Sequence, residues 1–166
     1  MIRNDKGATI MDSKKLVVYY SRSGTTRQVA EMIASRLKCD VEGIQDVRSR
    51  KGLFGWLRSG REAARRQLPE IKPTVKDPGQ YDLVVLGTPV WASAMSSPLR
   101  TYVTQNMGKF KRLALLVTYG SMGLDQALEG IKELCGQQPV ATLTMRTMEV
   151  RKGSHKQAVE EFVAKL

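Results

Sequence analysis

The sequence predicts an α/β domain with a doubly wound, five-stranded parallel sheet in the order 2-1-3-4-5 and helices on both faces. Apolar runs of strand length alternate along the chain with segments of helical periodicity, which favours parallel strands joined by right-handed crossovers. The runs are almost continuously apolar, as expected for strands covered on both faces. Polar turns follow the first, third and fourth runs. These runs are neighbours in the predicted order, so the turns should line one crevice at the carboxyl ends of the strands.

A chain of 166 residues is long enough for one domain with a sizeable core. Residues 1–14 are polar and lack periodicity, and we expect them to form a disordered leader. The domain is then predicted to span residues 15–166.

The first apolar run covers residues 16–20, and residues 27–37 follow it with helical spacing. Val29, Ile33 and Leu37 recur every four residues and would face the sheet. Residues 40–47 alternate weakly between apolar and polar, which predicts the second strand.

Residues 48–76 carry much of the positive charge of the chain. A helix is predicted here, with a buried stripe formed by Phe54, Leu57, Ala64 and Leu68. Trp56 points away from that stripe. The basic side chains could be a solvated helix face, or they could form a docking surface around Arg58, Arg61 and Arg65 with Trp56 as an anchor.

The second half of the chain repeats the strand and helix alternation. Residues 83–86 form an apolar run that ends at Gly87, and residues 90–98 are predicted to be a loop. Ser97 is a suitable N-cap, because Pro98 then takes the first helical position. The remaining elements are a strand over 113–118, a helix over 124–134, a strand over 140–148 and a closing helix capped by Ser154. His155 begins that helix and is expected at the surface, without a catalytic role.

Positive charge dominates the composition, with 27 Lys and Arg against 16 Asp and Glu and a formal net charge of +11. This balance favours acidic partners such as anionic lipids or phosphorylated small molecules, although a solvated surface without a partner is the simpler alternative. We do not expect nucleic acid among the partners. No apolar run approaches the ~18 residues of a membrane span. Cys39 and Cys135 are interpreted as reduced thiols, which predicts a cytoplasmic protein.

The turn after the first strand has the composition of a phosphate site. It reads Ser21-Arg22-Ser23-Gly24-Thr25-Thr26 and leads directly into a helix. Backbone N–H groups of such a turn converge with the helix N-terminus on one point, and hydroxyl groups add further donors. The sequence contains neither G-x-G-x-x-G nor G-x-x-x-x-G-K-[ST], which indicates a phosphate that is held and not transferred.

This turn resembles the [ST]-x-[ST]-G-x-T phosphate loop of flavodoxin-like FMN proteins, and Gly87-Thr88-Pro89-Val90-Trp91-Ala92 resembles their loop over the isoalloxazine ring. The resemblance runs from Lys15 to the C-terminus and implies FMN as cofactor. It implies phosphate contacts from the loop of Ser21, Arg22, Ser23, Gly24, Thr25 and Thr26. It also implies ring contacts from Thr88, Pro89, Val90, Trp91 and Ala92, with Tyr119 and Gly120 on the other side. Trp91 would be the stacking residue, although a core role for Trp91 or Tyr119 remains open.

The sequence departs in two ways from the flavodoxins that shuttle single electrons. The segment over 88–95 contains no glycine, whereas shuttle flavodoxins resemble one another in having one beside the flavin. A positive φ at Ala92 or Ser93 would be strained. The net charge of +11 should also attract the negative charge of a reduced flavin, whereas shuttle flavodoxins are acidic. Both departures weaken the interpretation as a low-potential shuttle.

The resemblance therefore implies an oxidoreductase or electron-transfer protein in which the flavin carries the chemistry. We predict no catalytic side chain and no metal site. One alternative is a reductase that uses NAD(P)H and a quinone or another small acceptor. A second alternative, of a different class, is a non-redox interaction module that has lost the flavin.

Overall fold

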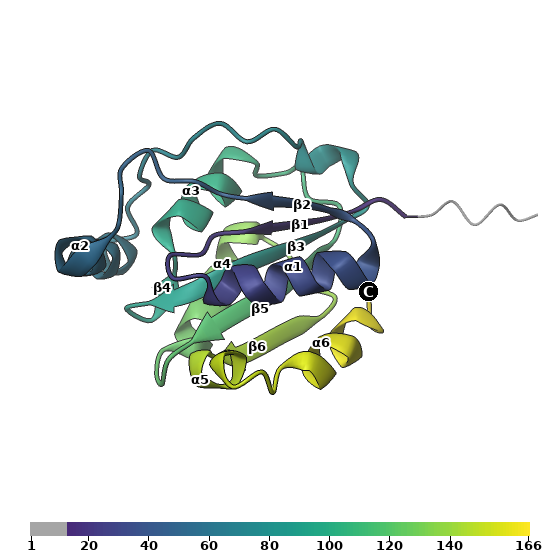
Figure 1. Cartoon of the computed structure of the whole chain (residues 1–166). Coiled ribbons are helices and arrows are strands. Elements are labelled where there is room, and N and C mark those ends of the chain that lie inside the picture. Colours follow the sequence, from purple (N-terminus) through teal and green to yellow (C-terminus); the bar gives the residue numbers. More distant parts are fainter. Residues whose placement is uncertain (1–12) are drawn as a thin grey trace, which may run out of the picture.

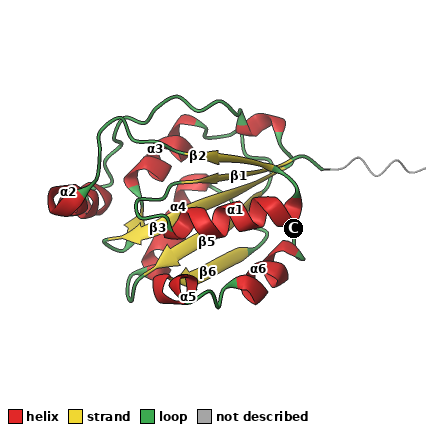
Figure 2. Ribbon diagram, viewed as in Figure 1, coloured by secondary structure: helices red, strands yellow, loops and turns green. Residues whose placement is uncertain are grey.

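The computed structural model describes residues 13–166 (Figures 1 and 2). The predicted disordered leader falls almost wholly on residues 1–12, which lie outside the described residues. In the described part, the first strand begins at Lys15, where the domain was predicted to start.

The sheet confirms the predicted order. Its five parallel strands run β2-β1-β3-β5-β6, and every neighbouring pair is parallel. The strands are β1 (Lys15–Tyr19), β2 (Asp40–Gly43), β3 (Leu83–Trp91), β5 (Leu113–Tyr119) and β6 (Thr142–Arg146). The three central strands are buried over most of their length, because helices cover both faces of the sheet.

Two cores lie on opposite faces of the sheet. One core joins the sheet to α1, α5 and α6, which span Thr25–Leu37, Thr147–Arg151 and Lys156–Val163. The other joins it to α3 and α4, which span Ser97–Gln105 and Leu124–Cys135. In Figure 2, α1 crosses one side of the strands while α3 and α4 lie behind them. A single turn of 3-10 helix, Pro78–Gln80, precedes β3.

The prediction of a loop over residues 90–98 is wrong, because most of this segment forms a β-hairpin. The strand β3 continues to Trp91 and pairs antiparallel with β4, Ala94–Met95. A two-residue hairpin turn of type I′, which matches the strand twist, has positive φ at both central residues. Ala92 and Ser93 adopt it, with φ of 45° and 60°. The strained conformation considered for this glycine-free segment is therefore the one it adopts.

The helix α2, Gly52–Ala64, exposes the face that was predicted to be buried. The buried residues are small ones, Gly55, Ser59 and Ala63. The predicted stripe of Phe54, Leu57, Ala64 and Leu68 is exposed, and Leu68 lies beyond the end of the helix. Figure 1 shows α2 at one edge of the molecule, on the side to which the strands point and near β4.

The C-terminal segment differs in detail from the prediction. The last strand is shorter than 140–148, because Thr147 already begins α5. Ser96, and not Ser97, precedes α3 as its N-cap residue. His155, and not Ser154, precedes α6, and its side chain is only 1% exposed. The surface placement predicted for His155 is therefore wrong. Within residues 13–166, no helix has the length and apolar character required to span a bilayer.

Candidate functional site

The turns after β1, β3 and β5 meet at the carboxyl ends of the strands and enclose a cavity of ≈ 150 Å³. Its walls come from three sources: the turn after β1, the end of β3 with the helix α2, and the end of β5 with the start of α5. The lining residues are Ser21, Arg22, Ser23, Thr25, Thr26, Trp56, Pro89, Val90, Trp91, Thr118, Tyr119, Gly120 and Thr147. This is the crevice that the strand order predicted.

The turn after β1 is shaped by Gly24. Its φ of 92° lies in the left-handed region and reverses the chain immediately before α1. The Gly24 N–H donates to Ser21 Oγ at 3.1 Å, which closes the turn. The next N–H groups, from Thr25 to Arg27, begin α1 and have no partner within the helix. An α1 N-terminus without acidic residues in its first turn is suited to an anion.

The turn carries four hydroxyl groups, of which Ser21 accepts from the Gly24 N–H and the other three have different surroundings. Ser23 Oγ and Thr25 Oγ1 lie 3.5 Å apart at the exposed rim. Thr26 Oγ1 is buried and bonded to Thr118 Oγ1 at 2.8 Å, which ties the start of α1 to β5. Thr26 therefore braces the turn through its side chain, and Ser23 and Thr25 are the hydroxyls free to meet a ligand.

The cavity wall contains no carboxylate among the described residues, and Arg22 adds a positive charge. Hydroxyl groups, N–H groups and one guanidinium on one side suit a phosphate. Elsewhere in residues 13–166, no cluster of His, Cys, Asp and Glu side chains is arranged to hold a metal ion.

Aromatic rings form the other side of the cavity. Trp91 ends β3 and Tyr119 ends β5, while Trp56 comes from α2. The buried ring of Tyr20 packs edge-on against Trp91, with ring centroids 5.4 Å apart. Arg146 Nε donates to the Tyr119 hydroxyl at 3.4 Å. These contacts hold two of the rings in place.

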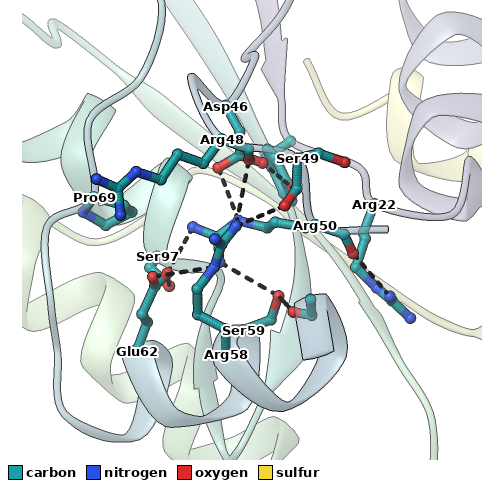
Figure 3. Close-up of polar contacts among 12 residues, drawn as sticks. Arg22, Asp46, Arg48, Ser49, Arg50, Arg58, Ser59, Glu62, Pro69 and Ser97 are labelled. Atoms are coloured by element: carbon teal, nitrogen blue, oxygen red, sulfur yellow. Dashed lines mark hydrogen bonds and ion pairs between the residues drawn. The ribbon is translucent and has the colours of Figure 1, made fainter. Parts of the chain in front are cut away.

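A buried arginine, Arg50, lies between the segment of Asp46 and the α2 residues Ser59 and Glu62 (Figure 3). Arg50 is 5% exposed, and its guanidinium carbon lies 5.4 Å from the Trp91 ring centroid. Arg50 Nε donates to Asp46 at 2.8 Å, and Nη2 pairs with Glu62 of α2 at 2.6 Å. Burial opposes the charge, but the hydrogen bonds to Asp46 and Glu62 and the attraction of their charges together outweigh burial and raise the pKa of Arg50.

Tyr20 completes this network from the end of β1. Its hydroxyl donates to Asp46 at 2.6 Å. Burial raises the pKa of Tyr20 well above its ordinary value, and the hydrogen bond to Asp46 acts in the same direction. Tyr20 therefore stays a neutral donor, and the β1 end, the Asp46 segment, α2 and Trp91 form one connected unit.

Most of the residues predicted from the sequence line the cavity together, but three do not. Thr88 is fully buried, and its Oγ1 accepts from the Ser96 N–H at 3.0 Å, which holds the hairpin. Gly24 shapes the turn without lining the cavity, and Ala92 lines a neighbouring cavity. Sequence reasoning missed Trp56 as a wall residue, together with Thr118 and Thr147. Thr118 is the penultimate residue of β5 and Thr147 directly follows β6, and these positions at the carboxyl ends of strands could have indicated both.

A second, more apolar cavity of ≈ 500 Å³ adjoins the first and shares Trp56, Val90 and Trp91 with it. It lies between α2 and the β3–β4 hairpin. A further cavity of ≈ 410 Å³ lies at the opposite end of the sheet, beside Lys15 and Asp40. That end carries the amino termini of the strands, where open parallel sheets do not bind their ligands.

The sequence pattern of the family described as Flavodoxin matches residues 14–166. Among solved structures, a flavoprotein from Lactobacillus acidophilus in complex with FMN is 24% identical over 86% of this chain and 99% of that one, with a TM-score of 0.70. The apo form of a flavoprotein from the same organism is 24% identical over 84% and 96%, with a TM-score of 0.60. The Trp repressor binding protein of Bacillus subtilis is 16% identical over 92% and 99%, with a TM-score of 0.58. The structural similarities establish the fold, and the match over 14–166 establishes the family: the chain belongs to the flavodoxins.

Proposed function

We propose that this protein binds FMN in the cavity at the strand ends and serves as an oxidoreductase. The observation that carries the proposal is the division of the cavity wall. Hydroxyl and N–H donors without any carboxylate lie on one side, and Trp56, Trp91 and Tyr119 lie on the other. A phosphorylated, planar aromatic molecule matches both sides at once. The flavoprotein of Lactobacillus acidophilus, which shares this fold, was crystallised with FMN.

The residues present fit the cofactor. Ser23, Thr25 and the first N–H groups of α1 would hold the phosphate, and Trp91 and Tyr119 would contact the ring. When bound, FMN supplies the electron-transfer chemistry. The cavity of ≈ 150 Å³ is smaller than the about 300–1,000 Å³ of an ordinary small-molecule site, but it opens beside the cavity of ≈ 500 Å³.

The test is a titration of flavin-free protein with FMN, followed by flavin fluorescence and visible absorbance. We expect saturable binding and a perturbed flavin spectrum, and we expect Trp91→Ala to weaken binding. Protein that neither carries nor takes up FMN would leave the non-redox interaction module as the correct alternative.

A small-molecule reductase is favoured among the redox roles by the apolar cavity of ≈ 500 Å³. Its volume suits a planar acceptor such as a quinone, placed beside the proposed flavin site. The measurement is steady-state oxidation of NADH or NADPH by the FMN-loaded protein with a soluble quinone present. Turnover supports the reductase, whereas reduction only by a partner protein supports an electron-transfer role.

Docking of a redox partner on the basic face would use fewer arginines than the sequence predicted. Arg58 is engaged, since it pairs with Glu62 and donates to the Ser49 carbonyl at 2.9 Å. Arg61 and Arg65 are exposed and available. The cytoplasm remains our proposed location, supported by two free, half-buried cysteines, Cys39 and Cys135. Cell fractionation would test it.

A further inference from the structure

The helix α2 exposes large apolar side chains and buries small ones. Leu53, Phe54 and Leu57 are 68%, 86% and 51% exposed. The buried positions Gly55, Ser59 and Ala63 follow one another at four-residue intervals and form the inner face. In a surface helix that serves only stability, the apolar stripe faces the core.

This orientation is fixed by specific contacts. A Cβ at Gly55 would collide with the Arg50 backbone carbonyl, so only glycine permits this close approach. Glu62 lies about two turns of helix after Gly55. Its side chain faces inward and pairs with Arg50 Nη2 at 2.6 Å. Arg58 Nη2 anchors the outer turn to the Ser49 carbonyl at 2.9 Å. A rotation of α2 about its axis that buried Phe54 would break all three contacts. The outward orientation of the apolar face is therefore fixed by the structure around α2.

Cations surround the exposed apolar side chains. With 3.6 residues per turn, Leu53 and Leu57 lie side by side, and Phe54 lies on the same side of the helix as Arg58, Arg61 and Arg65. Lys51 precedes the helix and Arg66 follows it, both exposed. The only acidic residue of α2, Glu62, is turned towards Arg50. The outer face therefore combines apolar and positive groups without a negative one.

We propose that this face, made of Leu53, Phe54, Leu57, Arg61 and Arg65, docks the protein on the surface of a membrane that contains anionic lipids. Trp, Phe and Leu beside Lys and Arg are the composition of helices that lie in the bilayer interface. The arginines would meet lipid phosphates at headgroup depth, while the apolar side chains enter below them. Nucleic acid would satisfy the charges but leave the leucines and Phe54 in water. An acidic protein is the competing occupant.

The test is co-sedimentation of the full-length protein with vesicles, at low and physiological salt. We expect binding to phosphatidylcholine vesicles containing about 30% phosphatidylserine to exceed binding to pure phosphatidylcholine by about tenfold or more, and to weaken with salt. Phe54→Ser should reduce binding to the anionic vesicles severalfold. The double variant Arg61→Gln/Arg65→Gln should do the same.

Matched controls separate this face from general hydrophobicity and charge. Val75→Ser removes an apolar side chain that is 92% exposed but lies outside α2. Lys152→Gln/Lys165→Gln makes the same change in net charge at exposed positions near the C-terminus. We expect both controls to bind like the wild type, and circular dichroism should show all variants folded. The proposal is overturned if no vesicle binds the protein, which leaves the face to an acidic protein partner, or if controls and α2 variants weaken binding equally.

Discussion

Two residues of this protein, Ala92 and Ser93, adopt backbone conformations that their residue types do not predict. Ala92 and Ser93 form the turn between β3 and β4 with φ of 45° and 60°, where glycine or asparagine is usual. The turn packs closely on the next loop, since a Cβ at Gly123 would lie 2.6 Å from the Ser93 Cα. The hairpin thus stores backbone strain beside the proposed flavin site.

Replacing Ala92 by glycine should stabilise the protein. Left-handed backbone costs an L-residue about 1–2 kcal/mol, whereas glycine loses about 0.5–1 kcal/mol more than alanine in conformational entropy on folding. The strain that glycine removes should exceed its entropy cost, so the free energy of unfolding should rise by up to about 1 kcal/mol. Urea denaturation measures this change. Ala94→Gly in β4 is the matched control and should destabilise, because its φ is negative. If Ala92→Gly lost as much stability as Ala94→Gly, the claim that the backbone at Ala92 is strained would be contradicted.

At the scale of elements, Arg50 determines how α2 packs. Its guanidinium reaches Asp46, Glu62 and the Trp91 ring from a buried position. The helix therefore turns its small residues and Glu62 inward. A sequence pattern of apolar spacing could not show this, because the inward face is specified by a charged side chain that precedes the helix.

Removing the Arg50 side chain should cost far more than removing an exposed arginine. Arg50→Ala leaves the mostly buried Asp46 without its paired cation and leaves Glu62 with only the longer pair to Arg58 at 3.6 Å, and breaking buried pairs in this way costs about 3–5 kcal/mol. Arg36→Ala, which breaks an exposed pair with Glu160, should cost about 0–1 kcal/mol. Chemical denaturation measures both, and tryptophan emission should also change for Arg50→Ala. Equal small losses in the two variants would show that Arg50 does not hold α2.

The elements that the sequence predicted well are those with one dominant signal. The strands β1, β3 and β5 were predicted because continuous apolar runs such as Leu83–Leu86 occur in strands buried on both faces. The turn at Gly24 was predicted because a hydroxyl-rich stretch with one glycine separates an apolar run from a segment of helical periodicity. The β3–β4 hairpin was missed because Ala92-Ser93 carries no turn signature, and its conformation comes from tertiary packing. His155 was wrongly predicted at the surface because the burial of a single polar residue cannot be inferred from a periodic pattern.

Across the whole molecule, exposed aspartates at the ends of elements are held ionised by neighbours. The hydrogen bond from Tyr81 lowers the pKa of Asp40, and the Gly79 N–H lowers that of Asp77. A hydrogen bond from Lys111 lowers the pKa of Asp82. A carboxyl group whose pKa is lower in the folded state stabilises the fold at any pH above the ordinary pKa of 3.8. This stabilisation is lost as the pH falls from 3.8 through the lower pKa of the folded state.

We therefore expect the urea midpoint to stay nearly constant between about pH 7 and 5 and to fall as pH drops below about 4. Protonation also removes negative charge from a protein of net charge +11, which adds repulsion in the same pH range. Asp82→Asn should reduce the acid dependence of the midpoint, since it deletes one of the linked groups. A midpoint independent of pH down to about 3, or one that rises there, would contradict this linkage.

The central claim, that the turn of Ser21–Thr26 holds the phosphate of FMN, is tested most directly by comparing FMN with riboflavin, which lacks the phosphate. The measurement is the ratio of their dissociation constants, by fluorescence titration of the wild type and of Ser23→Ala/Thr25→Ala. Hydrogen bonds to a charged group contribute about 1.5–3 kcal/mol each, so the wild type should bind FMN at least about tenfold more tightly than riboflavin. The variant should narrow this ratio while its affinity for riboflavin stays close to that of the wild type. Equal affinities of the wild type for FMN and riboflavin would contradict the phosphate site.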